Sequence, residues 1–363
     1  MSLPPKSKQV RTGPAEDPLR VVAIGGGTGL SSLLDGLKRY APRLPGGERG
    51  VEHALGPPVD ITVVVTVTDD GGSSGRLRRE FAVLPPGDIR NCMVALSEDQ
   101  ALLSRLFQYR FARGRGLKGH SFGNLFLTAL SHVTGDFPQA VKVSSEVLAI
   151  AGRIYPSTAG NVVLEARLAD GSTVAGETRI SKSRSRIERI RLRPSRCSPL
   201  KETLVRLRTA DLITLGPGSL FTSLIPNLLV RGIPEAIRES PAVKAYFVNL
   251  MWQPGETLRF TAADHVAAIH QHAGANLLEY VVVNTRPMRG PLLQRYARRG
   301  ALPVENDLER LGAMGLTVVA RDLLQEMAKI RHEPAATAAV AVELALEGRR
   351  RRQRWGRLAG AAG

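Results

Sequence analysis

The 363-residue sequence is poor in cysteine, in aromatic residues and in long apolar runs, and each shortage excludes a class of protein. Two cysteines, Cys92 and Cys197, cannot build the framework of a disulfide-rich secreted domain, and they suit a reducing compartment. No run of 18 apolar residues occurs, so we expect no membrane span. The opening stretch MSLPPKSKQVRTGPAEDP lacks the apolar segment of a signal peptide. We therefore expect a cytoplasmic protein.

Acidic residues are also in short supply, 33 against 50 lysines and arginines, which gives a formal net charge of +17. Residues 348–363 hold six arginines and no acid, and we expect a basic disordered tail there and a disordered segment at residues 1–19. Aromatic residues make up only 5%, and no nucleic-acid-reading motif occurs, so we expect no nucleic-acid partner. Nucleic-acid binding by the tail stays an alternative, and a basic pocket for an anionic ligand is the other use of this charge.

Strand and helix patterns alternate along the chain. Apolar or β-branched runs at residues 20–24, 60–68, 211–215, 243–249 and 280–284 are typical of strands buried on both faces of a parallel sheet. Helical spacing of apolar residues appears between them, which predicts an α/β fold with a Rossmann-like, doubly wound, mostly parallel sheet. We expect this domain to span residues 20–330, with a small β-meander insertion at about 160–195 and a C-terminal helix at 331–347.

Two glycine-rich turns each join a predicted strand to a predicted helix. In doubly wound sheets the ligand lies at the carboxyl ends of the strands, and the exposed N–H groups of such turns attract phosphate. Leu30 stands where the last glycine of a GxGxxG dinucleotide fingerprint would fall, and no Gly-Lys-Ser/Thr follows, so neither an NAD fingerprint nor a P-loop is present. Two phosphate-friendly turns favour a diphosphate ligand. The candidate ligand-binding residues are Gly25, Gly26, Gly27, Thr28 and Gly29 in the first turn and Gly216, Pro217, Gly218 and Ser219 in the second.

Polar residues at two further points complete the predicted site. Asp69 and Asp70 end the second strand, where they could hold a ribose or, together with phosphate oxygens, a Mg²⁺ ion. His120 and Asn124 are one turn apart at the start of an apolar helix and can face one pocket. No catalytic residue can be assigned from the sequence.

Taken together, these motifs resemble one family. The segments GGGTGL, TVTDDGGSSGRLRREF, PPGDIRNC, KGHSFGNLF, DLITLGPGSLFTSLIPNLL and NLMWQPGET…FTAADHV are similar to the gluconeogenesis factor family, which is related to 2-phospho-L-lactate transferase. The resemblance covers about residues 20–330. The chain departs from the expected pattern at Trp252, where the family has a threonine-containing form.

The resemblance implies a cytoplasmic bacterial protein that binds a UDP-sugar, such as UDP-N-acetylglucosamine, and is needed for cell shape and for growth on gluconeogenic carbon. The transferase relatives imply a second hypothesis, a Mg²⁺-dependent phosphotransferase in which Asp69 and Asp70 hold the metal ion. We expect a regulatory protein that catalyses no reaction; if it is an enzyme, we expect one like 2-phospho-L-lactate transferase. A regulatory protein partner and a homo-oligomer are compatible with either reading, and the sequence identifies neither.

Overall fold

The structure, a computed structural model, describes residues 17–42, 56–97 and 102–361. Its centre is a seven-stranded sheet with the order β10-β9-β8-β7-β1-β2-β3, in which every pair of neighbours is parallel. The predicted Rossmann-like, doubly wound α/β fold is confirmed. The strands are β1 (Leu19–Gly25), β2 (Val59–Val65), β3 (Arg153–Pro156), β7 (Leu212–Leu215), β8 (Val243–Phe247), β9 (Tyr280–Asn284) and β10 (Thr317–Arg321).

Strands β1 and β2 form the middle of the core, as their unbroken apolar sequences predict. They pair in register from Leu19 opposite Val59 to Gly25 opposite Val65, and side chains on both faces are buried. A strand covered on both faces needs no polar alternation, which explains its run of valine and isoleucine.

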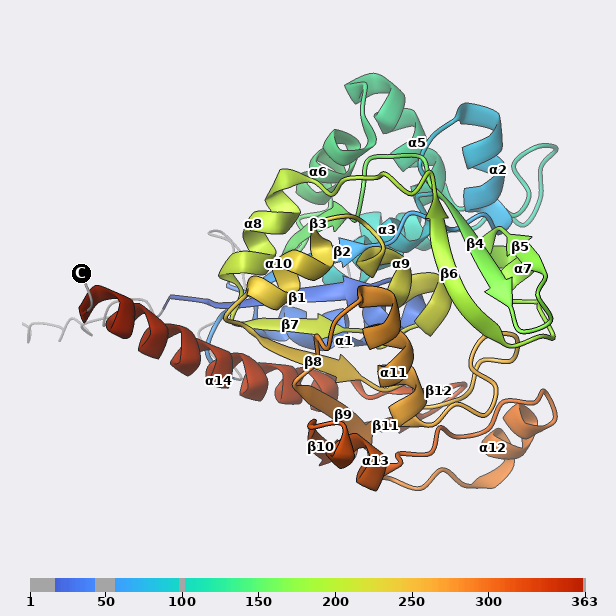
Figure 1. Cartoon of the computed structure of the whole chain (residues 1–363). Helices are drawn as coiled ribbons and strands as arrows, with labels where there is room; N and C mark the ends of the chain where they lie inside the picture. Colours follow the sequence, from blue (N-terminus) through green and yellow to red (C-terminus); the bar gives the residue numbers. More distant parts are fainter. Residues whose placement is uncertain (1–16, 43–55, 98–101, 362–363) are drawn as a thin grey trace, which may run out of the picture.

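Helices cover both faces of this sheet. Helix α14 runs beneath β7 and β8, while α8 and α10 lie on the other side of β7 (Figure 1). The described helices are α1 (Gly27–Leu37), η1 (Lys38–Tyr40), α2 (Gly72–Phe81), α3 (Gly87–Leu96), α4 (Leu102–Gln108), α5 (Phe122–Thr134), α6 (Phe137–Val147), α7 (Glu177–Ile180), α8 (Lys201–Thr209), η2 (Leu220–Leu224), α9 (Ile225–Leu228), α10 (Ile233–Glu239), α11 (Ala262–Ala273), α12 (Gly290–Ala297), α13 (Leu308–Ala313) and α14 (Pro334–Ala361).

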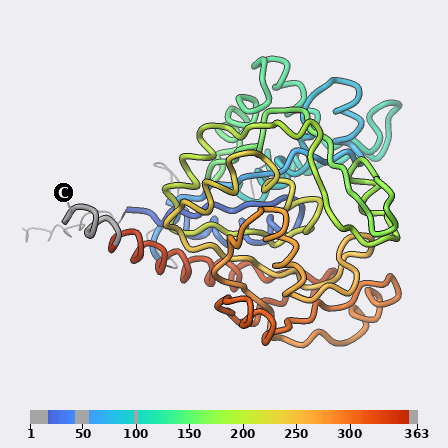
Figure 2. Tube along the Cα trace, in the orientation of Figure 1, coloured from blue at the N-terminus to red at the C-terminus, as the bar shows by residue number. Residues whose placement is uncertain are grey.

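The β-meander insertion is present as a separate antiparallel sheet with the order β5-β4-β6. Its strands are β4 (Val163–Leu168), β5 (Thr173–Ala175) and β6 (Ile187–Arg193), with α7 in the connection between β5 and β6. A short antiparallel pair, β11 (Leu324–Glu326) and β12 (Ile330–His332), follows the last parallel strand. The chain trace shows the insertion standing beside the main sheet (Figure 2).

The expectation of a disordered tail from residue 348 is wrong, because α14 continues without a break to Ala361. Arg349 and Arg352 hold the helix against the fully buried carboxylate of Asp211 through ion pairs of 2.8 Å. The Arg20 N–H also donates to Asp211, at 2.9 Å. Two of the six tail arginines thus share a specific internal partner, which the sequence pattern alone does not show. Of the N-terminal segment expected to be disordered, residues 1–16 lie outside the described residues.

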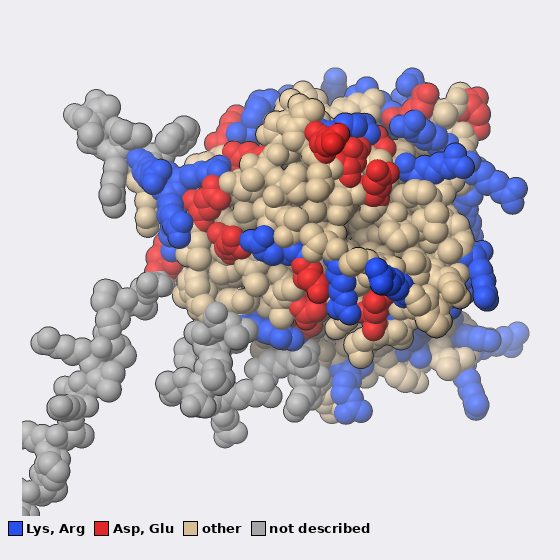
Figure 3. Space-filling model, turned by 90° about the horizontal axis from the view of Figure 1, so that it is seen from below, with Lys and Arg blue, Asp and Glu red and all other residues tan. Residues whose placement is uncertain are grey.

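Charge is spread unevenly over the surface. Lysine and arginine side chains prevail along the right edge of Figure 3, the side that carries the antiparallel sheet and α12 in Figure 1, whereas both signs mix elsewhere on that face. Among the described residues, no helix combines the length and the apolar character that crossing a bilayer requires.

We expect Asp211→Asn to lower the free energy of unfolding by about 3 kcal/mol, because it leaves two arginines without their shared carboxylate. Chemical denaturation measures the change. The control is Glu239→Gln, which breaks an exposed pair of 3.6 Å with Arg208 and should cost less than about 1 kcal/mol. Equal effects of the two substitutions would show that Asp211 does not anchor the C-terminal helix.

Candidate functional site

The two glycine turns meet at the carboxyl edge of the sheet. Strands β1 and β7 are neighbours in the sheet. The chain continues from β1 to β2 on one side and from β7 to β8 on the other, so the two turns flank the point where the strand order reverses. A Cβ on Gly29 would lie 2.8 Å from the carbonyl oxygen of Pro217, so the turns touch through backbone alone. This crevice is where doubly wound sheets bind ligands. The structure therefore brings the two predicted turns, residues 25–29 and 216–219, together.

The N-terminus of α1 already has an acidic neighbour, the side chain of Asp88. A Cβ on Gly26 would lie 2.5 Å from Asp88 Oδ2, and the Gly27 N–H donates to the same carboxyl group. Asp88 lies in the first turn of α3, with Pro86 at the N-cap, and not at the N-cap itself as PPGDIRNC suggests. One partly buried carboxyl group thus lies at the N-terminal ends of two helices, where anions are favoured.

The pKa of Asp88 is shifted strongly upward. Burial, and after it the charge of Asp69, raises the pKa of Asp88 to about 7. The Gly27 N–H and the positive charge of Arg90 act in the opposite direction. Asp88 therefore exchanges a proton near neutral pH, whereas an exposed aspartate is ionised throughout this range.

Asp69 and Asp70, predicted as a pair, have different partners. Asp69 accepts the Gly71 N–H at 2.8 Å, and its other oxygen lies next to Gly87, on the side of Asp88. Asp70 accepts two hydrogen bonds from Thr178 in the insertion, from the N–H at 2.8 Å and from the hydroxyl at 2.6 Å. Asp70 therefore ties the insertion to the β2 loop, and Asp69 is the member that faces the other acids.

The helix start that carries His120 and Asn124 contacts the same loop. His120 Nδ1 lies 2.9 Å from Ser73 Oγ, and Asn124 Nδ2 donates to Ser74 Oγ at 3.4 Å. Burial, followed by the nearby Arg76, lowers the pKa of His120. Asn124 is only 2% exposed, yet its Oδ1 has no hydrogen-bond partner within the protein. A buried acceptor without a donor is costly, so this atom is suited to receive a bond from a ligand.

Sequence reasoning missed two glutamates. Glu256, in the loop after β8, is buried and accepts from Thr222 Oγ1 at 3.0 Å, Ser181 Oγ at 3.1 Å and the Phe221 N–H at 3.3 Å. Glu177, at the start of α7, has a buried oxygen without a partner. Burial, followed by the negative charge of Asp69, raises the pKa of Glu177 well above its usual range. Nothing in the local sequence marks Glu177, since it reaches the region only through the folded insertion.

Two arginines lie among these acids. Burial lowers the pKa of both Arg78 and Arg90. Nearby acids act in the opposite direction: Asp70 and Asp69 for Arg78, and Asp88 and Asp69 for Arg90. Within the described part of the chain, no group of three or more His, Cys, Asp or Glu residues is arranged to hold a metal ion. A Mg²⁺ ion at Asp69 would therefore need oxygens from its ligand, as is usual where Mg²⁺ binds with phosphates.

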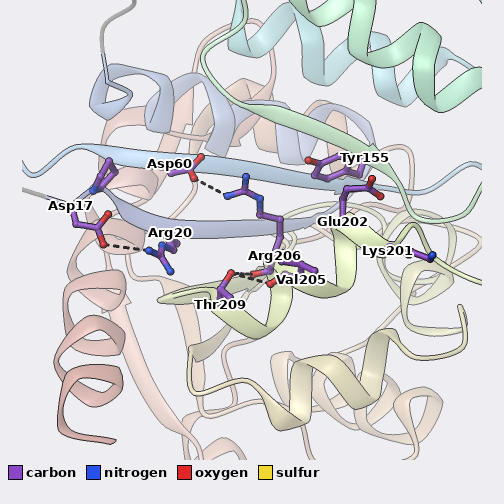
Figure 4. Close-up of a pocket in the computed structure, with 10 residues that line it drawn as sticks. Asp17, Arg20, Asp60, Tyr155, Lys201, Glu202, Val205, Arg206 and Thr209 are labelled. Atoms are coloured by element: carbon purple, nitrogen blue, oxygen red, sulfur yellow. Dashed lines mark hydrogen bonds and ion pairs between the residues drawn. The ribbon is translucent and has the colours of Figure 1, made fainter. Parts of the chain in front are cut away.

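Two cavities lie at opposite ends of the sheet. The larger, about 560 Å³, opens near the starts of β1 and β2 and is lined by Asp17, Arg20, Asp60, Tyr155 and residues of α8 (Figure 4). This cavity lies at the edge of the sheet opposite to the glycine turns. Four of the cavity's six charged residues are already paired with one another, since Arg206 contacts Asp60 at 3.0 Å and Arg20 contacts Asp17 at 3.4 Å.

The smaller cavity, about 200 Å³, lies at the same edge of the sheet as the glycine turns. It is lined by residues after β8 and β9, namely 248–250 and 284–288, together with Pro303, Val304 and Asn306. Asn249 connects it to the second turn, because its Oδ1 accepts the Gly218 N–H at 3.1 Å. Gln253, from the same loop, donates to Ser219 Oγ at 2.6 Å.

Comparison with known proteins assigns the family. Residues 21–324 match the family described as 2-phospho-L-lactate transferase CofD. The chain belongs to the CofD family. The gluconeogenesis factor of Bacillus subtilis is 46% identical over 330 residues, covering 90% of this chain and 98% of that protein. The gluconeogenesis factor of Halalkalibacterium halodurans is 43% identical over 331 residues, covering 91% and 97%. The crystal structure of a UPF0052 family member from Bacillus halodurans has a TM-score of 0.83 at 42% identity and covers 90% of this chain and 99% of its own.

The contact between the two turns predicts that no side chain larger than that of glycine fits at Gly29 without strain. We expect Gly29→Ala to lower the free energy of unfolding by about 1–3 kcal/mol, because the new methyl group overlaps the Pro217 carbonyl. Gly312→Ala is the matched control, since a Cβ there meets nothing within 4 Å. That substitution should stabilise α13 by about 0.5–1 kcal/mol. Two substitutions of equal effect in denaturant titration would contradict the contact.

The raised pKa of Asp88 predicts a pH dependence of stability. The folded protein keeps a proton on Asp88 up to about pH 7, whereas the unfolded chain loses it near pH 4. Stability should therefore fall as pH rises from about 4 to about 7 and then level off. Asp88→Asn cannot ionise, so its stability relative to the natural protein should rise over this interval, by up to about 4 kcal/mol.

Denaturation of the natural protein and of Asp88→Asn at a series of pH values measures this difference. Asp35→Asn, which removes a partly exposed carboxylate of α1 away from the site, is the matched control. A constant difference between Asp88→Asn and the natural protein would mean that Asp88 does not titrate in this interval.

Proposed function

We propose that this protein binds a UDP-sugar, such as UDP-N-acetylglucosamine, and acts as a regulator of bacterial cell shape and of growth on gluconeogenic carbon. The proposal rests on one observation: two glycine turns contact each other where the strand order reverses, and a cavity lies beside the second turn. The names of its relatives, gluconeogenesis factor, support the metabolic part of the proposal.

The diphosphate would lie at the crevice between the turns. The N–H groups at the start of α1 and the hydroxyls of Ser219 and Ser223 are the donors on this side, and Ser223 lies against Gly27. Asp88 shares that helix start, so an ionised Asp88 repels a phosphate and a protonated one can donate to it. Ligand affinity should therefore fall as pH rises through the neutral range.

The two ends of the ligand would be held by groups outside the turns. Asp69 and the unpartnered Asn124 Oδ1 suit hydroxyl or N–H donors of the ligand. The 200 Å³ cavity offers Asn249 and Asn306 as amide groups for the other end. The same cavity is lined by Thr285 and Arg286 besides apolar residues, so it offers several hydrogen-bonding groups to a polar ligand. This arrangement accounts for a ligand longer than a single phosphate.

A Mg²⁺-dependent phosphotransferase is the second candidate, favoured by the family's description as 2-phospho-L-lactate transferase. The charge of Asp69 raises the pKa of both Asp88 and Glu177, and Asp88 also raises that of Glu177, so this region concentrates acidic groups. Mg²⁺ bound with the ligand's phosphates would offset that charge and the charge that develops on a transferred phosphoryl group. Arg78 or Arg90 would stabilise the same charge.

Calorimetric titration with UDP-N-acetylglucosamine, UDP-glucose, NAD and GDP, each with and without Mg²⁺, separates the two candidates. Binding of a UDP-sugar without turnover on long incubation supports the regulator. Binding of GDP that requires Mg²⁺, without a UDP-sugar signal, supports the transferase and overturns the first proposal.

We expect Asn124→Ala to weaken UDP-sugar binding about 10- to 100-fold, because a buried hydrogen-bonding group is worth about 1–3 kcal/mol. The control is Asn276→Ala, in an exposed turn after α11, which should bind as the natural protein does. Unchanged affinity of Asn124→Ala, with an unchanged unfolding temperature, would remove Asn124 from the site. In cells, the same variant should fail to restore growth on gluconeogenic carbon to a strain that lacks the natural protein.

A further inference from the structure

One surface of the molecule combines exposed apolar side chains with positive charge. Residues 102–119, from α4 through the loop that leads to α5, contain five cationic residues and no acid. The same stretch carries large apolar side chains that are unusually exposed: Leu102 (75%), Leu103 (41%), Leu106 (37%), Tyr109 (53%) and Leu117 (44%). The cationic residues are Arg105, Arg110, Arg113, Arg115 and Lys118. We call this set the α4 patch.

The exposure of the leucines follows from how α4 packs. Ser104 and Phe107 face inward, where Ser104 Oγ accepts from Ser97 Oγ at 2.9 Å and the Phe107 ring packs on Phe126 at 5.0 Å. Helical geometry then turns Leu102, Leu103 and Leu106 outward. Neighbouring exposed leucines on one short helix are costly in water and mark a contact surface.

The loop of the α4 patch stands at a corner of the molecule. It lies beside α2, to which Arg76 links it by donating to the Lys118 carbonyl at 2.9 Å (Figure 1). Arg76 and Arg79 of α2 extend the positive charge, and Glu80 is the one acid of that helix.

We propose that the α4 patch docks on an anionic lipid membrane. The leucines bury in the acyl boundary, Tyr109 lies at the interface, and the arginines contact the phosphate headgroups. A second copy of the chain fits poorly, because it would set five cations against five cations. Nucleic acid fits poorly as well, because the apolar groups are mainly aliphatic, whereas bases stack on aromatic rings. The net charge of +17 draws the whole chain toward an anionic surface.

The patch connects directly to the candidate ligand site. The Phe111 N–H donates to the His120 carbonyl at 2.9 Å, and the Phe122 N–H donates to the Tyr109 carbonyl at 2.8 Å. Docking that orders residues 109–119 would thus act on the backbone that positions His120 and Asn124. The membrane contact itself does not depend on which nucleotide the protein binds.

Sedimentation of the full-length protein with vesicles tests the proposal. We expect binding to vesicles of phosphatidylcholine with one quarter phosphatidylglycerol and none to phosphatidylcholine alone. The double substitution Leu102→Asp with Leu106→Asp should lower the bound fraction at least tenfold. Arg113→Glu with Arg115→Glu should do the same, and it keeps the leucines. Unfolding temperatures within about two degrees of the natural protein's show that the variants remain folded.

Two controls identify the surface. Val205→Asp, at a 57% exposed position of α8, should leave binding unchanged. Arg350→Glu with Arg354→Glu removes charge from α14 and should retain most of the binding. Loss of binding in the α14 variant alone, or no binding of the natural protein to either vesicle, overturns the proposal. Analytical ultracentrifugation adds one more contrary outcome: a dimer that only the Leu102/Leu106 variant dissociates, without lipid binding, would make the patch an interface between copies.

Discussion

The close contact between two backbone turns, Gly25–Gly29 and Gly216–Ser219, is the constraint on which the candidate site depends. Parallel pairing of β1 with β7 brings the strand ends together, and the backbone of Pro217 can approach this closely only because Gly29 has no side chain. This contact fixes where α1 starts relative to the loop after β8, through the bonds of Gly218 to Asn249 and of Ser219 to Gln253. Backbone geometry thus shapes the crevice, and it determines where the polar groups around the crevice lie.

Asp88 shows how a glycine-rich helix start can contain its own anion. In a phosphate site the N–H groups at the helix start are left for the ligand. Here the carboxyl group of Asp88 lies against Gly26 and Gly27, and burial, followed by the charge of Asp69, raises its pKa to about 7. A phosphate entering the crevice meets either a neutral carboxylic acid, which can donate, or a carboxylate, which repels. Protonation and ligand binding should therefore be coupled at this position.

Patterns local in sequence predicted the fold and the turns, whereas contacts between distant segments stayed hidden. The runs of valine and isoleucine in β1 and β2 indicate a two-sided burial that the structure confirms. The positions of the glycine turns and of Asp69 at one edge of the sheet follow from their place at the ends of predicted parallel strands. The place of Asp88 in the site does not follow from the local sequence, because its neighbours Gly26 and Gly27 lie in a distant segment of the chain. The expected disorder of the tail was wrong, since the partner of Arg349 is Asp211, 138 residues earlier.

The β-meander insertion contacts the acidic region and connects two loops of the main sheet, the one after β2 and the one after β8. Thr178 binds Asp70 in the loop after β2, while Ser181, three residues later, donates to Glu256 in the loop after β8. Glu256 in turn accepts from Thr222, just beyond the second glycine turn. One short segment therefore spans loops from both sides of the strand reversal. Since Glu177 lies within it and is buried near Asp69, any movement of the insertion alters the charge that a ligand meets in the crevice.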